Sequence, residues 1–153
     1  MAVDQNGTSV LVIGLQGCLC AIPLSHVIEI MRPLPVVPIS NSLPFVRGMA
    51  IIRGIPTPVV DLEKLLGVPD KDTHRFVTLR LGQRQLVLSV SEVLGIVEMD
   101  PLTVMELPSL LLGSSKDVIE AVGTLDAQAL MVLQSGWQLP EEVWQAMAAQ
   151  ETA

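Results

Sequence analysis

The stretch RGMAIIRGIPTPVVDLEKLLG, residues 47–67, contains the signals that decide the fold. Met49 to Arg53 alternate with a period of two, which predicts a strand on which Met49, Ile51 and Arg53 share one face. Gly54 follows at the point where a hairpin turn needs a residue that tolerates positive φ. The alternation and the glycine together predict that this strand ends in a tight turn.

The second half of the stretch predicts another strand and then a short capped helix. Pro56 and Pro58 each lack a backbone N–H, so this strand is expected at a sheet edge or a barrel corner. The carboxylate of Asp61 can cap a helix that begins at Leu62, and Gly67 can end it. Residues 47–67 therefore predict the order strand, turn, strand, helical turn.

The composition indicates an acidic domain that leaves apolar surface exposed. A chain of 153 residues fits one domain, or two small subdomains that share a core. Apolar residues make up 50% and charged residues only 16%, too few to cover the surface, so apolar patches should remain for partners. The net charge of −7 argues against nucleic-acid binding, which needs clustered Lys and Arg.

The remainder of the chain reads as many short strands separated by turn residues, which predicts an all-β barrel or sandwich. Residues 24–31 fit either a helical turn or a strand. Pro140 opens an expected C-terminal helix. The further strands are expected at 8–15, 19–23, 76–81, 85–90, 93–99, 118–125 and 129–133.

Candidate sites for chemistry are few. Ser25 and His26 are adjacent and would therefore point apart on a strand, and His74 lies in a linker-like segment without clustered carboxylates. No phosphate-binding or dinucleotide-binding glycine pattern occurs, so we expect no enzyme and no cofactor. Cys18 and Cys20 lie two apart on one expected strand, which suits small core residues in a reducing cytoplasm better than a disulfide or a zinc site, so no metal is expected.

An exported lipoprotein is one alternative, because residues 15–18, Leu-Gln-Gly-Cys, look like a lipoprotein cleavage box. A secretory signal needs a positive start, however, and no Lys or Arg precedes Arg32. Acylation at Cys18 would predict membrane fractionation. No apolar run approaches the roughly 18 residues that a membrane span needs, so direct membrane insertion is not expected.

The motif Gly-x-x-x-x-Arg-Gly-x-x-x-Pro-Val-Val-Asp-Leu, residues 48–62, resembles the signature of the CheW-like domain of bacterial chemosensory systems. The similarity covers roughly residues 8–147. The other matching segments are 21–30, which contains Val-Ile-Glu-Ile, 43–48, which contains Leu-Pro-Phe-Val-Arg-Gly, and the downstream segments 81–84 and 92–97.

This resemblance implies an all-β fold with short helices: two five-stranded SH3-like barrels that share a core, and a C-terminal helix. Residues 8–147 would form the single domain, with flexible termini at 1–7 and 148–153. The implied function is a non-catalytic cytoplasmic adaptor, recruited to membrane-bound receptor arrays. It would couple the signalling tip of a methyl-accepting chemoreceptor to the regulatory domain of a CheA-type histidine kinase.

The resemblance also selects the candidate binding residues. Arg53 matches an arginine in the family's receptor-binding region, where its guanidinium could reach a partner's carboxylate or carbonyl. Val27 and Glu29 match the same region, and Met49 and Ile51 are expected on the strand face of Arg53. The residues expected to serve turns and caps are Gly48, Gly54, Asp61 and Gly67.

The chain departs from the family pattern at three places. Ile51 stands where the signature usually has asparagine, Ser91 replaces the usual aspartate before Glu92, and the closing strand ends at Gln134 rather than at an acid. These changes raise a second hypothesis, a diverged scaffold of a non-flagellar chemosensory pathway, such as one for surface motility, with altered partners.

Overall fold

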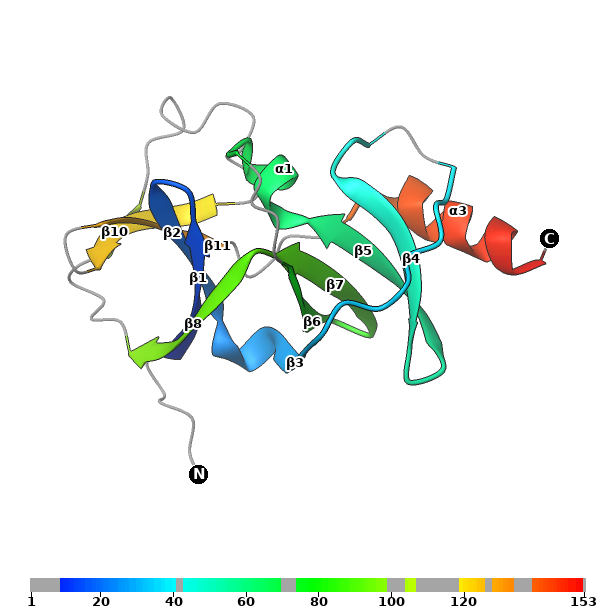
Figure 1. The fold of residues 1–153 in the computed structure, drawn as a ribbon, viewed down its shortest axis with the longest axis horizontal. Coiled ribbons are helices and arrows are strands. Elements are labelled where there is room, and N and C mark those ends of the chain that lie inside the picture. The colour runs from blue at the N-terminus through cyan, green and yellow to red at the C-terminus, as the bar shows by residue number, and fades with distance from the viewer. Residues whose placement is uncertain are drawn as a thin grey trace.

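The chain folds into two β-sheets with a few short helices, as predicted (Figure 1). The computed structural model describes residues 9–40, 43–69, 74–98, 104–106, 119–125, 128–133 and 139–152. The first sheet has six strands in the order β8-β1-β2-β11-β10-β9. Its strands are β1 (Ser9–Leu15), β2 (Cys18–Pro23), β8 (Glu92–Glu98), β9 (Val104–Glu106), β10 (Ile119–Leu125) and β11 (Gln128–Leu133).

The second sheet has five strands in the order β3-β6-β7-β5-β4. It is inserted between β2 and β8 of the first sheet, so the chain leaves the first sheet and later returns to it. The resemblance implied two five-stranded units, and the short β9 makes the first sheet one strand larger. The strands of the second sheet are β3 (Val27–Met31), β4 (Val46–Ile52), β5 (Ile55–Asp61), β6 (Arg75–Leu81) and β7 (Arg84–Val90).

Residues 24–31, which the sequence left undecided, form both of the predicted structures. A 3-10 turn, η1 (Leu24–His26), follows β2 and leads directly into β3. The turn has no side-chain cap, and its last residues pass into extended backbone at Val27. This segment carries the chain from the first sheet to the edge of the second.

The prolines of β5 are accommodated in the half of the strand that has one neighbour. Pro56 and Pro58 lie opposite Ile51 and Met49 of β4, and the parallel pairing with β7 begins only at Val59. A proline in that first half therefore removes no donor from the pairing with β7. Of the two positions expected for this strand, a sheet edge or a barrel corner, the edge is taken by β4, and the prolines of β5 lie where the strand pairs with β4 alone.

The short helix α1 (Leu62–Leu66) has the predicted caps. The backbone N–H of Lys64 donates to Asp61 Oδ1 at 3.1 Å, which satisfies one of the free donors of the first turn. Gly67 ends the helix in the left-handed conformation, with φ of 74°. The two caps thus fix where α1 begins, directly after β5, and where it ends.

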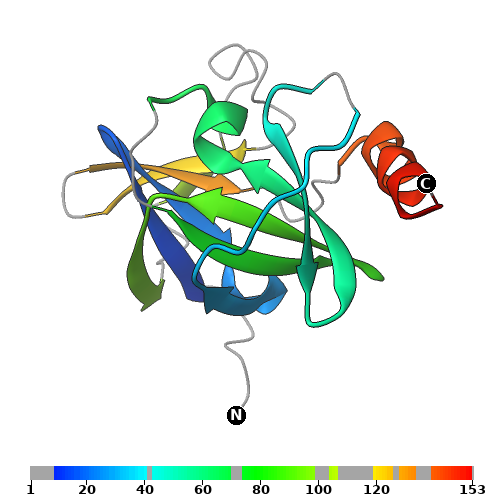
Figure 2. The same ribbon diagram turned by 45° about the vertical axis from the view of Figure 1, so that its right-hand side comes forward.

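The two sheets share one main hydrophobic core. It contains Ile13 and Ile22 of the first sheet together with Val77 and Leu88 of the second, all completely buried. The C-terminal helix α3 (Glu141–Thr152) lies beside the second sheet on the side away from the first (Figure 2). The helix continues past residue 147, where the sequence analysis placed the end of the domain. Val143 and Met147 of the helix, and Leu139 just before it, pack in the main core.

The two cysteines belong to the interior. Cys20 is completely buried in the main core, and burial, with a smaller contribution from Cys18, raises the pKa of its thiol to about 12. Cys18 is half-buried and packs against the same core. A thiol held in the protonated form by burial is a poor nucleophile, so the core position agrees with the predicted role of small hydrophobic residues.

Candidate functional site

Arg53 lies in the turn between β4 and β5. Its φ is 51° and that of Gly54 is 84°, and Ile52 pairs with Ile55 across this two-residue turn. Two successive positive φ angles are the signature of the type I′ hairpin turn, whose twist matches the flanking strands. The predicted hairpin is present, but the prediction that Arg53 shares a strand face with Met49 was wrong, because β4 ends one residue earlier.

The side chain of Arg53 is held by Glu29 of β3. Nε of Arg53 donates to Oε2 of Glu29 at 2.8 Å, and Nη2 donates to Oε1 at 2.8 Å. These hydrogen bonds lower the pKa of the Glu29 carboxyl below its ordinary value and raise the pKa of Arg53. The Arg53 side chain is still 76% exposed, whereas that of Glu29 is 24% exposed. The structure thus brings together two of the predicted site residues.

This ion pair joins opposite ends of the second sheet. β3 and β4 are the two outer strands in the order β3-β6-β7-β5-β4, and Arg53 extends from the turn that follows β4. A bidentate pair has a defined geometry, because the planar guanidinium fits the two carboxylate oxygens. Glu29 therefore holds the guanidinium of Arg53 in one orientation at the protein surface.

Exposed isoleucines lie on the same two segments as the ion pair. Ile28 and Ile30 of β3 are 42% and 44% exposed, and Ile51 and Ile55 of the β4–β5 hairpin are 53% and 51% exposed. Ile28 and Ile30 alternate with Glu29 along β3, so these two side chains lie on the opposite face of that strand. Ile51 adds exposed apolar surface to the hairpin that carries Arg53.

Two of the predicted contact residues are less accessible than the others. Met49 is buried, and its backbone makes two hydrogen bonds with Val37 at 2.8 Å, which tie the proline-rich segment 33–38 to β4. Val27 is partly buried and packs against the main core. The side chains of Met49 and Val27 therefore contribute mainly to packing. Ile51 is more exposed than either of them.

Gly48 is needed for this arrangement. Its φ is 145°, and a Cβ atom on this residue would collide with the carbonyl oxygen of Val37. The glycine permits Val37 to approach closely and to pair with Met49 in an isolated antiparallel bridge at the edge of β4. Gly54 and Gly67 also have positive φ, and Asp61 caps α1, so the structure gives all four predicted turn and cap residues a backbone role.

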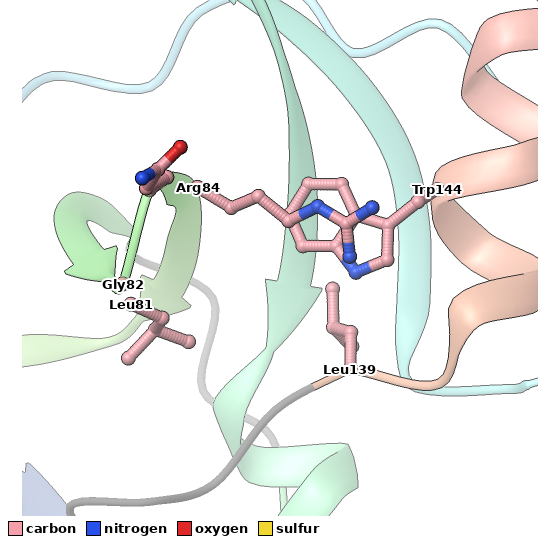
Figure 3. Close-up of a pocket in the computed structure, with 6 residues that line it drawn as sticks. Leu81, Gly82, Arg84, Leu139 and Trp144 are labelled. Carbon is pink, nitrogen blue, oxygen red and sulfur yellow. The ribbon is translucent and has the colours of Figure 1, made fainter.

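A second cluster, which the sequence did not predict, joins α3 to the β6–β7 hairpin. Arg84 donates from Nη1 and Nη2 to the two carboxylate oxygens of Glu141, both at 3.0 Å. The same guanidinium lies over the ring of Trp144, 4.6 Å from its centroid (Figure 3). The partners are 57 or more positions apart, so no local sequence pattern pointed to this cluster.

Ser91 and Glu63 form a buried pair at the return from the second sheet to the first. Oγ of Ser91 donates to Oε1 of Glu63 at 2.6 Å, and both residues are buried. Ser91 lies between β7 and β8, and Glu63 lies in the first turn of α1. Position 91, where the family signature has aspartate, is thus a serine in this chain. Its hydrogen-bonding partner, Glu63, is itself a carboxylate.

The part of the chain that the structure describes contains no group of three or more His, Cys, Asp or Glu residues placed to hold a metal ion. None of its helices has the length and apolar character needed to cross a membrane.

Comparison with known proteins gives a family and a fold. The model of the CheW-like domain matches residues 9–137. Among solved structures, the scaffolding protein TtCheW from Thermoanaerobacter tengcongensis is similar, with a TM-score of 0.74 and 17% sequence identity over 87% of this chain and 97% of that one. The comparison with curated proteins found no match. The family match spans both sheets, and the structural match agrees with the two-sheet fold.

Proposed function

The chain belongs to the CheW-like domain family, and from that premise we propose that it is a non-catalytic cytoplasmic adaptor of a bacterial chemosensory complex. It couples the signalling tip of a methyl-accepting chemoreceptor to the regulatory domain of a CheA-type histidine kinase. Through these contacts it is recruited to membrane-bound receptor arrays. No cofactor takes part in this function.

The observation that carries this proposal is the exposed Arg53, oriented by Glu29 and accompanied by exposed isoleucines. Arg53 uses Nε and Nη2 on Glu29, so the N–H groups of Nη1 remain for a partner's carboxylate or carbonyl. An arginine that is already oriented loses little side-chain entropy on binding. We therefore assign Arg53 as the charged anchor, and Glu29 as the residue that positions it.

An adaptor needs at least two surfaces, and the first sheet offers another. Leu94 and Ile96 of the edge strand β8 are 53% and 62% exposed, and they alternate with half-buried neighbours. We call the surface formed by Arg53, Glu29, Ile51 and Ile55 the Arg53 surface. With one partner there and another at β8, each partner would raise the effective concentration of the other. This bivalency is the physical mechanism of coupling that we propose.

A diverged scaffold of a non-flagellar pathway, such as surface motility, is the second candidate. Ile51 favours it, because an exposed isoleucine replaces the usual asparagine beside the anchor. A partner that binds there must offer an apolar surface rather than hydrogen bonds to an amide. Replacing Ile51 with asparagine should strengthen binding to partners from a flagellar system and weaken binding to the native ones.

The test measures binding of purified kinase regulatory domain and receptor signalling fragment from the native host to three variants. Arg53→Glu should weaken binding of at least one partner about tenfold or more, since a charged hot-spot residue is inverted. Lys64→Glu makes the same charge change on α1 and serves as the matched control. Unchanged binding of both partners by Arg53→Glu would contradict the proposal.

The exchange variant, Arg53→Glu with Glu29→Arg, separates an anchor from a structural pair. It restores the ion pair between β3 and the hairpin but places a carboxylate where the guanidinium was. If Arg53 contacts the partner, the exchange variant should recover thermal stability without recovering binding. Recovery of both would mean that the pair acts only by holding β3 to the hairpin.

A further inference from the structure

A groove lies between α3 and the second sheet, next to the Arg84–Trp144 pair. Its apolar walls are Trp144 of α3 and, from the start of β5, Ile55 and Pro56. The polar part of the lining comes from the β6–β7 hairpin: Arg80, Gln83, Arg84 and Gln85. The cavity has a volume of about 240 Å³. Ile55 also belongs to the Arg53 surface, so the groove adjoins that surface on the side of α3.

Arg80 brings an uncompensated charge to this groove. It is exposed, and within the described segments its side chain makes no hydrogen bond or ion pair. Its neighbour Arg84 is engaged by Glu141, but both side chains of that pair are about half exposed, at 49% and 60%. The Arg84 guanidinium therefore stays accessible to a second carboxylate while Glu141 holds it.

The charge of the groove contrasts with that of the whole protein. The chain has a net charge of −7, yet two arginines line one small apolar groove. Gln85 cannot add much, because its side-chain Nε2 donates to Thr57 Oγ1 at 3.1 Å. The groove therefore offers guanidinium groups at its rim and an aromatic, proline and isoleucine surface inside.

We propose that this groove docks a peptide segment of a partner protein in which a carboxylate side chain stands beside a bulky apolar one. Arg80, assisted by Arg84, binds the carboxylate, and the apolar side chain packs on Trp144 and Ile55. Arginine suits this task because its planar fork can bind a carboxylate with two hydrogen bonds. The inference goes beyond the adaptor function and does not depend on it.

An unbiased selection tests the proposal with defined probes. Random 12-residue peptides displayed on phage are selected on the full chain, with the Arg80→Gln variant as competitor in solution to remove peptides that bind elsewhere. The expected result is enrichment of sequences with Asp or Glu next to a large apolar residue. Absence of enrichment, or enrichment of sequences without acids, would overturn the proposal.

The enriched peptide is then synthesised without tryptophan and titrated against the Trp137→Phe variant, in which Trp144 is the remaining fluorophore. Arg80→Gln should weaken binding about tenfold, as should the peptide with Gln in place of its acids. Arg75→Gln removes an exposed charge from the same strand and should leave the affinity within about twofold. If both variants lost peptide affinity equally, the loss would come from the changed net charge of the protein rather than from a contact with Arg80. That result would refute the site.

A separate readout keeps this proposal distinct from the adaptor function. Arg80→Gln should leave the binding that depends on Arg53 unchanged, and Arg53→Glu should leave the peptide affinity unchanged. Melting temperatures of both variants verify that the fold is intact. Loss of peptide binding in Arg53→Glu would show that the selected peptides bind the Arg53 surface instead, and would refute the groove.

Discussion

Ser91 shows how one residue can accommodate a change in the interior. CheW-like sequences usually have an aspartate at this position, whereas here the Ser91 hydroxyl donates to the Glu63 carboxylate at 2.6 Å in a buried environment. Two carboxylates at that separation would repel each other, and one would have to bind a proton. A serine supplies the donor that Glu63 can use, so the departure at position 91 is matched by the residue that faces it.

The Ser91 variants should therefore differ in stability in a defined order. Ser91→Ala should lower the free energy of unfolding by about 1–3 kcal/mol, because the buried Glu63 loses a hydrogen-bond donor. Ser91→Asp should cost more, and adding Glu63→Gln should recover part of that loss, since an amide can donate to the new carboxylate. Urea unfolding at pH 7 measures all three, with Ser25→Ala on the exposed turn η1 as control. This account would be contradicted if Ser91→Ala unfolded at the same urea concentration as the wild type.

At the scale of elements, the Glu29–Arg53 pair connects β3 with the β4–β5 hairpin, at opposite ends of the second sheet. The sheet order leaves these two elements without backbone pairing to each other among the described residues. The side chains supply the connection instead. The same contact that orients the anchor therefore also links the two ends of the sheet.

The stabilisation by this pair should depend on pH in one direction. The pKa of Glu29 is lower in the folded state than in the unfolded chain, so the stabilisation is complete above the ordinary carboxyl pKa of about 4.3 and is lost as pH falls through the folded-state pKa. Wild type should melt above Glu29→Gln at pH 7, and the difference should shrink as pH falls through the lowered pKa of Glu29. Glu98→Gln on β8 is the control. A difference independent of pH would contradict the assignment.

Local chemistry explains which elements the sequence could predict. The β4–β5 hairpin and the Asp61 cap depend on residues a few positions apart, and both were predicted. Arg53 was misplaced because the alternation of Met49, Ile51 and Arg53 continues through the end of the strand, and an arginine with positive φ is uncommon. Gly54 marks the turn, but nothing in the sequence pattern shows that the turn begins one residue earlier, at Arg53.

The site contacts depend on the topology. Arg53 meets Glu29 across 24 positions, Ser91 meets Glu63 across 28, and Arg84 meets Glu141 across 57. No periodicity relates such residues. Resemblance to the family supplied the first pair as candidates. Glu141 lies outside the matched motifs, so the Arg84–Glu141 contact could be found only from the fold.

At the scale of the whole molecule, the shared core determines how the surfaces are held. The second sheet is inserted between β2 and β8, and side chains of both sheets pack in one cluster with those of α3. The Arg53 surface belongs to the second sheet and the β8 surface to the first. A common core keeps two such surfaces in a constant relation, which an adaptor that must position two partners requires.

This architecture predicts that the two sheets unfold together. Leu88 of β7 is completely buried in the shared core, so Leu88→Ala should lower the free energy of unfolding by about 2–5 kcal/mol. In native-state hydrogen exchange, the slowest amides of β1 and β11 should lose as much protection as those of β6, although the substitution is in the other sheet. The exposed Gln83→Ala serves as the control. If protection falls in β5, β6 and β7 but is retained in β1 and β11, each sheet is a separate cooperative unit. The shared core would then not hold the Arg53 surface and the β8 surface in a constant relation.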